Sequence, residues 1–500
     1  MVRIAFLTLL TIISVNGFSQ GQNLLPNEHH LRMTLDEAIS TAREQSPAAM
    51  IAKYNFLAGY WRYRTFKAKF LPSLNLNATL GSYSRYLAKL QDAETGKFNY
   101  VENNNMSNSL SLSVDQNIGL TGGTLSLTSS LNRLDQFAPY DNLTYNSTPV
   151  SLVYSQPING YNSFRWEKMI EPKEYDRIQK VYLESMESIN IEAADRFFSV
   201  LSAQKNLEMA EKNYAATQLS VSIAEKRYEI GSITNNELLQ LKMSLYNAQL
   251  EINDGKMNFE SEMLKLRSYL GYNESVIIEL IMPEMGPEIQ LDYSDVLDRA
   301  LKNSSENLSN ELDMLAARQE VAEAKSNAGL NAKLFAQFGV NQKGEKLADS
   351  YRNPMDQEIV GLSLSLPILD WGLGRGKIKL AKSREEIAKT QIEQTESEYR
   401  QEILIKVMQF NNQKMQCSIS ARNDSIAKLR YDITMERFKN GSISVTELNT
   451  AQTEKDNAVK RYISDLNNYW KYFYSIRKIS LYDYLDKKEI VTDFNLLTEN

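Results

Sequence analysis

The residue types that most often carry enzymatic chemistry are scarce in this chain of 500 residues. The two histidines, His29 and His30, lie near the N-terminus, so imidazole acid–base catalysis and most zinc chemistry are excluded from the main body. The single cysteine, Cys417, rules out a disulfide within the chain and a cysteine-based metal cluster. We therefore expect neither an enzyme nor a bound cofactor or metal.

Two other groups of residues invite a chemical interpretation. The glycines of WGLGRG (371–376) suggest a phosphate-binding loop, but the spacing G-x-G-x-x-G is absent and the segment follows a strand that ends at Pro367. We interpret this segment as a strand-to-helix transition. The 17 methionines suggest copper export, yet they are scattered along the chain, and helix packing explains them better.

A glycine-centred motif occurs twice, 210 residues apart: RYEIGSITNNELL starts at Arg227, and RFKNGSISVTEL starts at Arg437. A glycine at φ > 0 ends a long helix with little strain, and the Ser and Thr residues that follow offer caps for the next helix. The motif therefore predicts two tight turns between helices. Their central residues are Gly231, Ser232, Gly441 and Ser442.

Long helices must position these turns. No proline occurs between Pro172 and Pro283 or after Pro367, and these intervals are rich in helix-forming residues with apolar spacings of three and four. We predict helical hairpins over 173–272 and 377–485. The first helix alone would run ~87 Å at 1.5 Å per residue, which indicates a coiled coil or a helical barrel.

The N-terminus has the features of a secretory signal. Residues 1–19 contain one arginine, an apolar run of about 12 residues from Ile4 to Val15, and a small-residue pattern that ends at Ser19. The run is shorter than the ~20 residues that a membrane-spanning helix needs, which favours a signal over an anchor. No other segment resembles a membrane-spanning helix, so the exported protein would enter a membrane only as a β-barrel.

Between the helices the sequence alternates with a period of two. Strands are predicted over about 73–158 and 333–368. Apolar residues share one face and small polar residues the other in the stretches LNLNATLGSY, SLSLSVDQNIGLTGGTLSLTSSL, PVSLVYSQPI and VGLSLSLPI. This pattern is typical of outer-membrane strands and also of soluble sandwiches, but the export signal and the lack of charges on the second face favour the membrane. Aromatic residues near these strands are expected at the membrane interfaces, although aromatics favour strands in any protein. They are Tyr83, Tyr86, Tyr154, Tyr161, Trp166 and Trp371.

The repeat extends well beyond the glycine motif. Pro157 and Pro367 are 210 residues apart, and so are Tyr272 and Tyr482, so the correspondence covers a strand end and a whole helical hairpin. The preceding halves correspond less closely, in LDEAISTAREQSP and YSDVLDRALKNSS. We therefore divide the chain into a signal peptide, two structural repeats and a tail. The predicted boundaries are 1–19, 20–290, 291–485 and 486–500.

These features together resemble the TolC-like outer-membrane factors, the exit ducts of tripartite efflux pumps and type I secretion systems. The resemblance rests on the repeated R-[YF]-x-x-G-S-I-x-x-x-E-L, the strand ends QPING and LPILDWG, and the opening helix MTLDEAISTAREQSP. It covers the chain from about Met33 to Tyr484. It implies an α+β membrane protein in which a homotrimer forms a long antiparallel helical barrel and a transmembrane β-barrel.

The resemblance also implies partners. The glycine turns would form the periplasmic end and meet a periplasmic adaptor protein, with an inner-membrane pump acting indirectly and outer-membrane lipid around the barrel. The family usually has four strands per protomer. The extra hairpin around Thr121-Gly123 would either add two strands and widen the barrel or be accessory.

Three residues near the turns are candidates for a pore constriction. In the resemblance Glu447 takes the place of a gate aspartate, Glu237 is its counterpart in the first repeat, and the second gate position falls on uncharged Thr450. A ring of carboxylates would act as an electrostatic constriction. The alternative is that both glutamates are helix N-terminal charges favoured by the dipole.

The sequence thus predicts a channel in the outer membrane, extending into the periplasm, that exports small molecules or proteins. The net charge of −6 gives no indication of nucleic-acid binding. The main alternative is a periplasmic adaptor or coiled-coil scaffold without a channel. Adaptors normally have one helical hairpin and a lipoyl-like domain, whereas a surface adhesin would lack the duplication with paired strands.

Overall fold

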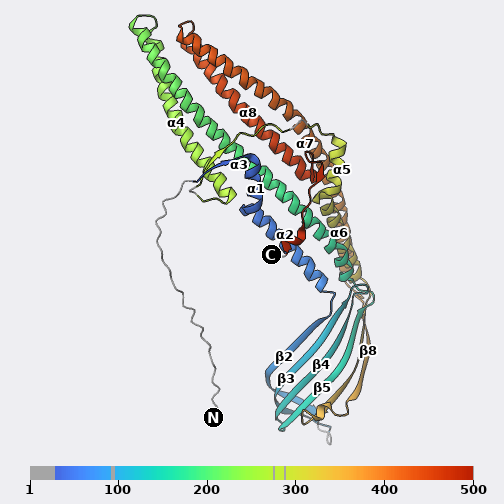
Figure 1. Cartoon of the computed structure of the whole chain (residues 1–500). Helices are drawn as coiled ribbons and strands as arrows, with labels where there is room; N and C mark the ends of the chain where they lie inside the picture. The colour runs from blue at the N-terminus through green and yellow to red at the C-terminus, as the bar shows by residue number, and fades with distance from the viewer. Residues whose placement is uncertain (1–28, 92–95, 274–275, 287–288, 499–500) are drawn as a thin grey trace, which may run out of the picture.

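The computed structural model describes residues 29–91, 96–273, 276–286 and 289–498 (Figure 1). The predicted signal peptide, 1–19, lies outside the described residues. The molecule is elongated, with a β-sheet at one end and two helical hairpins that reach away from it. Within the described residues, no helix has the length and apolar character needed to cross a membrane.

Strands that lie before the helix α3 (Ser163–Glu229) and strands that lie before the helix α7 (Leu373–Lys439) join one antiparallel sheet. They are β2 (Ser73–Gln91), β3 (Phe98–Ile118), β4 (Gly123–Ala138), β5 (Asn142–Pro157), β7 (Asn331–Gly344) and β8 (Met355–Ser365). The order in the sheet is β2-β3-β4-β5-β7-β8. The extra hairpin, β3 and β4, therefore adds two strands inside the sheet, between β2 and β5, rather than forming an accessory flap. The outer edges of β2 and β8 have no neighbouring strand in the described part of the chain.

Two helices run from the sheet to the far tips. They are α3 (Ser163–Glu229) and α7 (Leu373–Lys439), each of 67 residues and therefore ~100 Å long. Four shorter helices pack beside them. α2 (Pro47–Ala68) and α4 (Asn235–Leu270) pack against α3, and α6 (Ser305–Asn327) and α8 (Val445–Ser480) pack against α7.

The ends of the two helical hairpins differ from the predicted ones. α3 starts at Ser163 rather than 173, because Asn162 caps it by accepting a 3.1 Å hydrogen bond from Arg165 N. Pro172 lies inside this helix; it removes one backbone N–H without ending the helix. α8 stops at Ser480 rather than 485, because Leu481 takes a left-handed φ of 47°.

Small elements surround the middle of the long helices. β1 and β6 pair in parallel, and β9 and β10 form a second two-stranded sheet. The predicted tail is part of this region, since the Phe494 ring lies 4.9 Å from the Phe56 ring. The elements are β1 (His29–Met33), α1 (Leu35–Gln45), β6 (Val276–Leu280), α5 (Tyr293–Asn303), β9 (Tyr482–Asp483), β10 (Lys488–Glu489) and α9 (Phe494–Thr498); the 3₁₀ turn η1 (Asp349–Tyr351) links β7 to β8.

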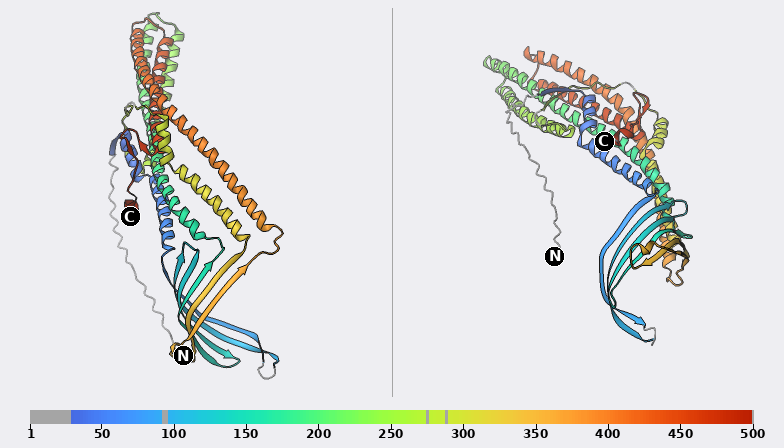
Figure 2. Two further views of the ribbon diagram at one scale, coloured as in Figure 1. Left: turned by 90° about the vertical axis from the view of Figure 1, so that its right-hand side faces the viewer. Right: turned by 60° about the horizontal axis from the view of Figure 1, so that its bottom comes forward.

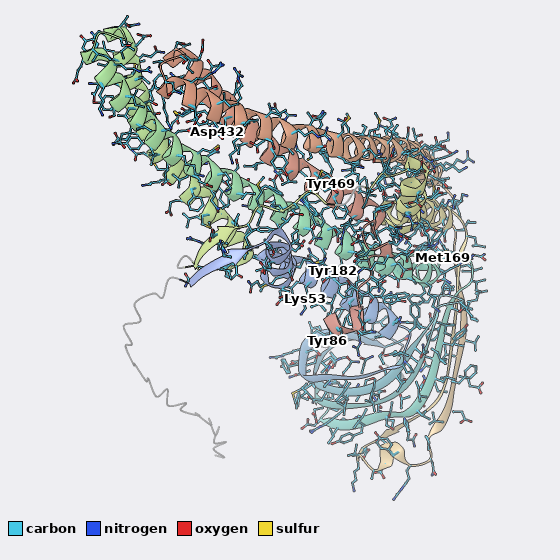
Figure 3. All side chains as sticks on the ribbon, turned by 45° about the horizontal axis from the view of Figure 1, so that its top comes forward. Lys53, Tyr86, Met169, Tyr182, Asp432 and Tyr469 are labelled. Carbon is cyan, nitrogen blue, oxygen red and sulfur yellow. The ribbon has the colours of Figure 1, made fainter. Side chains whose placement is uncertain are left out.

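The main hydrophobic core lies at this middle level, where Figure 3 shows Tyr182 and Tyr469. Glu187 of α3 is fully buried there and accepts two 3.1 Å hydrogen bonds from the guanidinium of Arg477 of α8. Arg477 also donates a 2.6 Å hydrogen bond to Asp483. A buried carboxylate needs such partners, so this cluster joins the two hairpins firmly.

Candidate functional site

One face of the sheet is apolar across the strands. Leu74, Val114, Leu127, Leu152 and Phe338 are consecutive partners on five neighbouring strands, so their side chains form a continuous row. Leu74 is 68% exposed and Phe338 is 48% exposed. An exposed apolar surface of this extent marks a contact with lipid or with another protein.

The opposite face of the same sheet is polar. Asn75, Ser113, Thr128 and Ser151 form the neighbouring row across four strands, and Ser113 and Ser151 are buried despite lying on a single sheet. Asp115 lies on this face and accepts hydrogen bonds from Asn75 Nδ2 (2.9 Å) and Ser113 Oγ (2.8 Å). Figure 2 shows the strong curvature of the sheet, and the lower exposure of the polar side chains places them on its inner side.

Charged residues gather in the half of the sheet far from the helices. Arg85 pairs with Glu102 at 2.6 Å, and Arg133 pairs with Asp135 at 2.9 Å. Strands of 16 to 21 residues are longer than the ~9–11 residues that a membrane-spanning strand needs. The apolar rows near the helices are therefore suited to the lipid, and the charged far halves are suited to water.

The six predicted interface aromatics lie at two levels of the molecule. Tyr83 and Tyr86 are in the far half of β2, whereas the other four lie where the sheet joins the helices. Tyr161, Trp166 and Trp371 belong to the connections and first helical turn rather than to strands. Trp371 is the most exposed of these, at 90%.

Tyr83 and Tyr86 lie on opposite faces of β2. Tyr86 is the direct partner of Asn103, which lies on the inner, polar face, whereas Tyr83 pairs with Met106 on the apolar face. Asn103 Nδ2 donates a 2.9 Å hydrogen bond to the Tyr86 hydroxyl. Two residues three positions apart on a strand point to opposite faces, so only one of the two tyrosines can lie on the apolar face. The irregular register between Thr79 and Ser82 places Tyr83 there.

The two flanks of the helical wall carry exposed apolar stripes. α4 and α7 each bury one side against their hairpin partner, and the exposed apolar residues recur at intervals of three, four and seven on the opposite side. α2 continues the α4 flank toward the sheet with Met50, Tyr54 and Trp61. The α4 stripe is Leu239, Met243, Tyr246, Leu250, Met257 and Leu264, and the α7 stripe is Met408, Met415, Ile419, Ile426 and Ile433.

The predicted turns form the two far tips in the same way. Gly231 has φ +74° and Gly441 has φ +79°, a region that favours glycine. At each tip the serine N–H returns to the last helical turn: Ser232 N donates to Arg227 O at 2.8 Å, and Ser442 N donates to Arg437 O at 3.0 Å. The helix caps are Thr234 and Ser444, not the serines next to the glycines.

The two candidate glutamates differ in what their carboxylates do. Glu237 completes a capping box, accepting hydrogen bonds from Thr234 N (2.8 Å) and Thr234 Oγ1 (3.0 Å), and these donors lower the pKa of Glu237. Glu447 has no such side-chain bond among the contacts of the described residues; only its N–H bonds Ser444 Oγ, at 3.3 Å. Both glutamates lie in the first turn of their helices, where the dipole favours a carboxylate, and Glu237 differs in that its carboxylate is also held by the capping box.

Glu447 and Thr450 border a groove of about 530 Å³ between α7 and α8 near the second tip. Arg430, which pairs with Glu454, and Arg437 lie on the same groove, so it combines one carboxylate with two cations. Thr450 uses its hydroxyl to donate a 2.9 Å hydrogen bond to Thr446 O. The structure brings Glu447 and Thr450 together and leaves Glu237 on the other tip.

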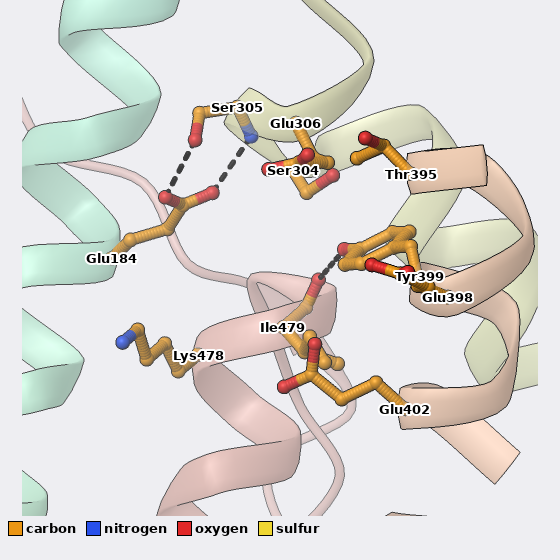
Figure 4. A pocket seen from close by; sticks show the side chains of 10 residues that line it. All are labelled: Glu184, Ser304, Ser305, Glu306, Thr395, Glu398, Tyr399, Glu402, Lys478 and Ile479. Carbon is orange, nitrogen blue, oxygen red and sulfur yellow. Dashed lines mark hydrogen bonds between the residues drawn. The ribbon is translucent and has the colours of Figure 1, made fainter. Parts of the chain in front are cut away.

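A second hollow, of about 550 Å³, lies where α3, α6, α7 and α8 meet (Figure 4). Glu184 accepts 2.7 Å hydrogen bonds from Ser305 N and Ser305 Oγ, so it caps the N-terminus of α6, whose own cap residue makes no such bond. Burial together with the charges of Glu184 and Glu402 raises the pKa of Glu306. Sequence reasoning missed this cluster because its four carboxylates come from three separate helices; they are Glu184, Glu306, Glu398 and Glu402.

The carboxylates of Glu187 and Glu184, described above, join neighbouring helices through hydrogen bonds. Among the described residues, no three carboxylate, imidazole or thiol groups converge in a way that would hold a metal ion. Cys417 is buried, donates a 3.0 Å hydrogen bond to Asp465 O, and burial raises its pKa to about 11, so it is poorly suited to act as a nucleophile.

Comparison with known proteins identifies the same architecture. The model of the outer membrane efflux protein family matches residues 118–272 and 303–479, about two thirds of the chain. The CmeC outer membrane channel of Campylobacter jejuni aligns with 93% of this chain and 88% of its own, at a TM-score of 0.64 and 15% identity. The outer membrane protein VceC of Vibrio cholerae covers 89% of this chain and 95% of its own, at a TM-score of 0.62 and 15% identity.

A third solved structure, the open state of the MtrE outer membrane channel of Neisseria gonorrhoeae, covers 92% of this chain and 91% of its own. Its TM-score is 0.51, and it is 14% identical. No curated protein sequence matches this chain. At these identities the solved structures show a shared fold, and the family model carries the classification.

Proposed function

The chain belongs to the outer membrane efflux protein family, and on this premise we propose that three copies form a channel through the outer membrane that continues as a helical tunnel into the periplasm. It is an outer-membrane transport protein rather than an enzyme. In this proposal it is the exit duct of a tripartite efflux pump or a type I secretion system and exports small molecules or proteins.

The observation that carries this proposal is that one protomer is an open wall. The sheet has two free edges, β2 and β8, and the helices beside those edges carry the unpartnered apolar stripes of α2 and α4 on one flank and of α7 on the other. Free strand edges and apolar helix faces are unstable in water unless another chain covers them. Because the two flanks differ, one flank of each copy would bind the other flank of the next copy. Such head-to-tail contacts form a closed ring when the rotation from copy to copy adds up to a full turn.

The internal repeat supports pairing of the two flanks. Within one protomer α3 packs on α8, through contacts such as Asn213 with Asp456 (2.6 Å) and Asp195 with Asn467 (3.2 Å). A shift of 210 residues converts α3 into α7 and α8 into α4, and it carries Asp456 onto Tyr246 of the α4 stripe. The α7 stripe of one protomer and the α4 stripe of the next would thus repeat the α3–α8 packing that already exists.

The strand count implies a wide barrel. Three copies of a six-stranded sheet would supply eighteen strands. The TolC-like factors usually have four strands per protomer, and three such protomers supply twelve. Because barrel diameter grows with strand number, we expect a larger membrane pore than a twelve-stranded barrel has. The inner face, with hydroxyl and amide groups such as those of Asn75 and Ser113, suits a water-filled pore.

The tips are proposed to meet a periplasmic adaptor protein, which would connect the duct to an inner-membrane pump. The turns at Gly231-Ser232 and Gly441-Ser442 are exposed and lie farthest from the sheet (Figure 1). They are short and held by backbone hydrogen bonds, so they present a defined surface. The same family membership argues against the alternative of a periplasmic adaptor or scaffold without a channel.

The experiment that tests the proposed function is fractionation followed by gel electrophoresis without heating. We expect the protein in the outer-membrane fraction, as a heat-sensitive species with three chains, and we expect that purified trimers conduct ions in planar lipid bilayers. A monomer recovered in the periplasmic fraction would contradict the proposal.

A matched pair of substitutions tests which face of the sheet contacts lipid. Leu112 and Ser111 are neighbours on β3 whose side chains point to opposite faces. We expect Leu112→Arg to oppose membrane insertion by ~2–4 kcal/mol, because it places a cation on the lipid face. Ser111→Arg should insert normally and lower the single-channel conductance. Insertion of urea-denatured protein into lipid vesicles measures the first effect, and equal insertion of both variants would refute the assignment.

A second pair tests whether Glu447 lines the pore. We expect Glu447→Gln to reduce the cation selectivity of the reconstituted channel, because symmetry multiplies one carboxylate into a ring. Glu237→Gln should leave selectivity unchanged, since the Glu237 carboxylate is occupied by Thr234. The reversal potential across a salt gradient measures both. An unchanged reversal potential in Glu447→Gln would exclude a pore-lining role.

A further inference from the structure

The last turn of α3 makes a specific contact with the end of α7. Arg227 Nη2 donates hydrogen bonds to Phe438 O at 3.0 Å and to Lys439 O at 3.3 Å. The guanidinium carbon of Arg227 lies 5.5 Å from the centre of the Phe438 ring. A cation therefore satisfies carbonyls at the negative end of a neighbouring helix and stacks on its aromatic residue, which fastens the first tip to the second.

The repeat contains the same pair with the roles exchanged. A shift of 210 residues converts Arg227 into Arg437, and the reverse shift converts Phe438 into Tyr228, so an arginine and an aromatic residue recur at equivalent positions. Arg437 makes no side-chain hydrogen bond or ion pair among those of the described residues, and it is exposed. Phe438 is 2% exposed whereas Tyr228 is 46% exposed, so the second pair lacks within one protomer the contact that the first pair has.

The glycines of the turns show the same difference. A side chain at Gly441 would meet Arg227 Nη2 at 2.5 Å, so glycine here leaves room for the arginine. At the equivalent Gly231, no atom of the described chain lies within 4 Å of that position. The first tip thus has an exposed aromatic residue, an open glycine and helix-end carbonyls that receive no side-chain donor among the described residues. At the second tip the equivalent Phe438 O accepts Gly441 N–H and Arg227 together, so the backbone bond from Gly231 N–H to Tyr228 O leaves room for a second donor.

We infer that Arg437 binds the C-terminal end of α3 of the neighbouring protomer, donating to the carbonyls of Tyr228 and Glu229 there and stacking on the Tyr228 ring. The inference rests on the proposed trimer, and the partner is a second copy of this chain. Three contacts by Arg227 within protomers would then alternate with three by Arg437 between protomers, and together they hold the six tips side by side at the periplasmic mouth.

Cysteine pairs test this contact, in a Cys417→Ser background that keeps a hydroxyl donor toward Asp465 O. The test pair is Arg437→Cys with Glu229→Cys, and the control pair, shifted by 210 residues, is Arg227→Cys with Lys439→Cys. Purified trimers are treated with a short bifunctional methanethiosulfonate. All four positions lie at the tips, away from the main core, so folding and assembly should survive.

We expect the test pair to give covalent species with two and three chains on a denaturing gel. The control pair should link within a chain and keep the mass of one chain, with the linked peptides identified by mass spectrometry. Intact trimers in which the test pair stays at the mass of one chain would overturn the inference. Absence of any trimer in the unsubstituted protein would instead overturn the proposed function, so the two failures are distinguishable.

Discussion

Leu250→Asp is expected to abolish assembly of the three-chain channel. Leu250 is 60% exposed in the single protomer and lies in the middle of the α4 stripe, which we propose packs on α7 of the next protomer. Burying an unpaired carboxylate in such an interface costs roughly 3–5 kcal/mol, and the ring contains three copies of it. Export activity should be lost together with the trimer band on an unheated gel.

The neighbouring position provides the control. Gln249 is exposed but lies about 100° around the helix from Leu250, outside the stripe. Gln249→Asp adds the same charge to the same helical turn and should assemble and export normally. If both variants form trimers, the α4 stripe is not the interface; if neither does, the effect comes from helix α4 itself.

Gly441→Pro is expected to stop export while leaving the trimer assembled in the outer membrane. Proline cannot adopt the φ of +79° found here, and it lacks the N–H that Gly441 donates to Phe438 O at 3.0 Å. The substitution therefore costs more than about 1 kcal/mol and must rearrange the tip. The sheet and the main core lie far from this turn, so insertion should be unaffected (Figure 1).

Ser442→Ala is the matched control for this turn, because it keeps the Ser442 backbone N–H that bonds Arg437 O. Export can be followed as drug accumulation in cells, and contact with the adaptor by co-purification. Normal export in cells that carry Gly441→Pro would show that the shape of the tip does not matter for coupling.

Several parts of the structure were predictable because they depend on local chemistry. Glycines followed by Ser and Thr caps mark the ends of long helices whatever surrounds them, so Gly231 and Gly441 were found from their neighbours alone. The alternation of apolar and small polar residues likewise identified the strands, since side chains on a strand point alternately to two faces.

Other parts depended on contacts between distant segments. Pro172 looked like a helix boundary, but the capped start at Ser163 and packing along α3 keep it inside the helix. The alternation predicted the strands but not their order, so the place of β3 and β4 inside the sheet followed only from the pairing. The faces of Tyr83 and Tyr86 likewise followed only from the pairing, because an irregular register is a property of two strands together.

The sequence by itself determined the two glycine turns and the amphipathic strands, because turn geometry and periodicity act over a few residues. The tertiary structure decided which equivalent residues have the same role. Glu237 and Glu447 occupy matching positions, yet only Glu237 closes a capping box. Arg227 and Arg437 also match, but among the described residues only Arg227 binds a helix end of its own chain. In the proposed ring, the helix end that would receive Arg437 belongs to the next protomer.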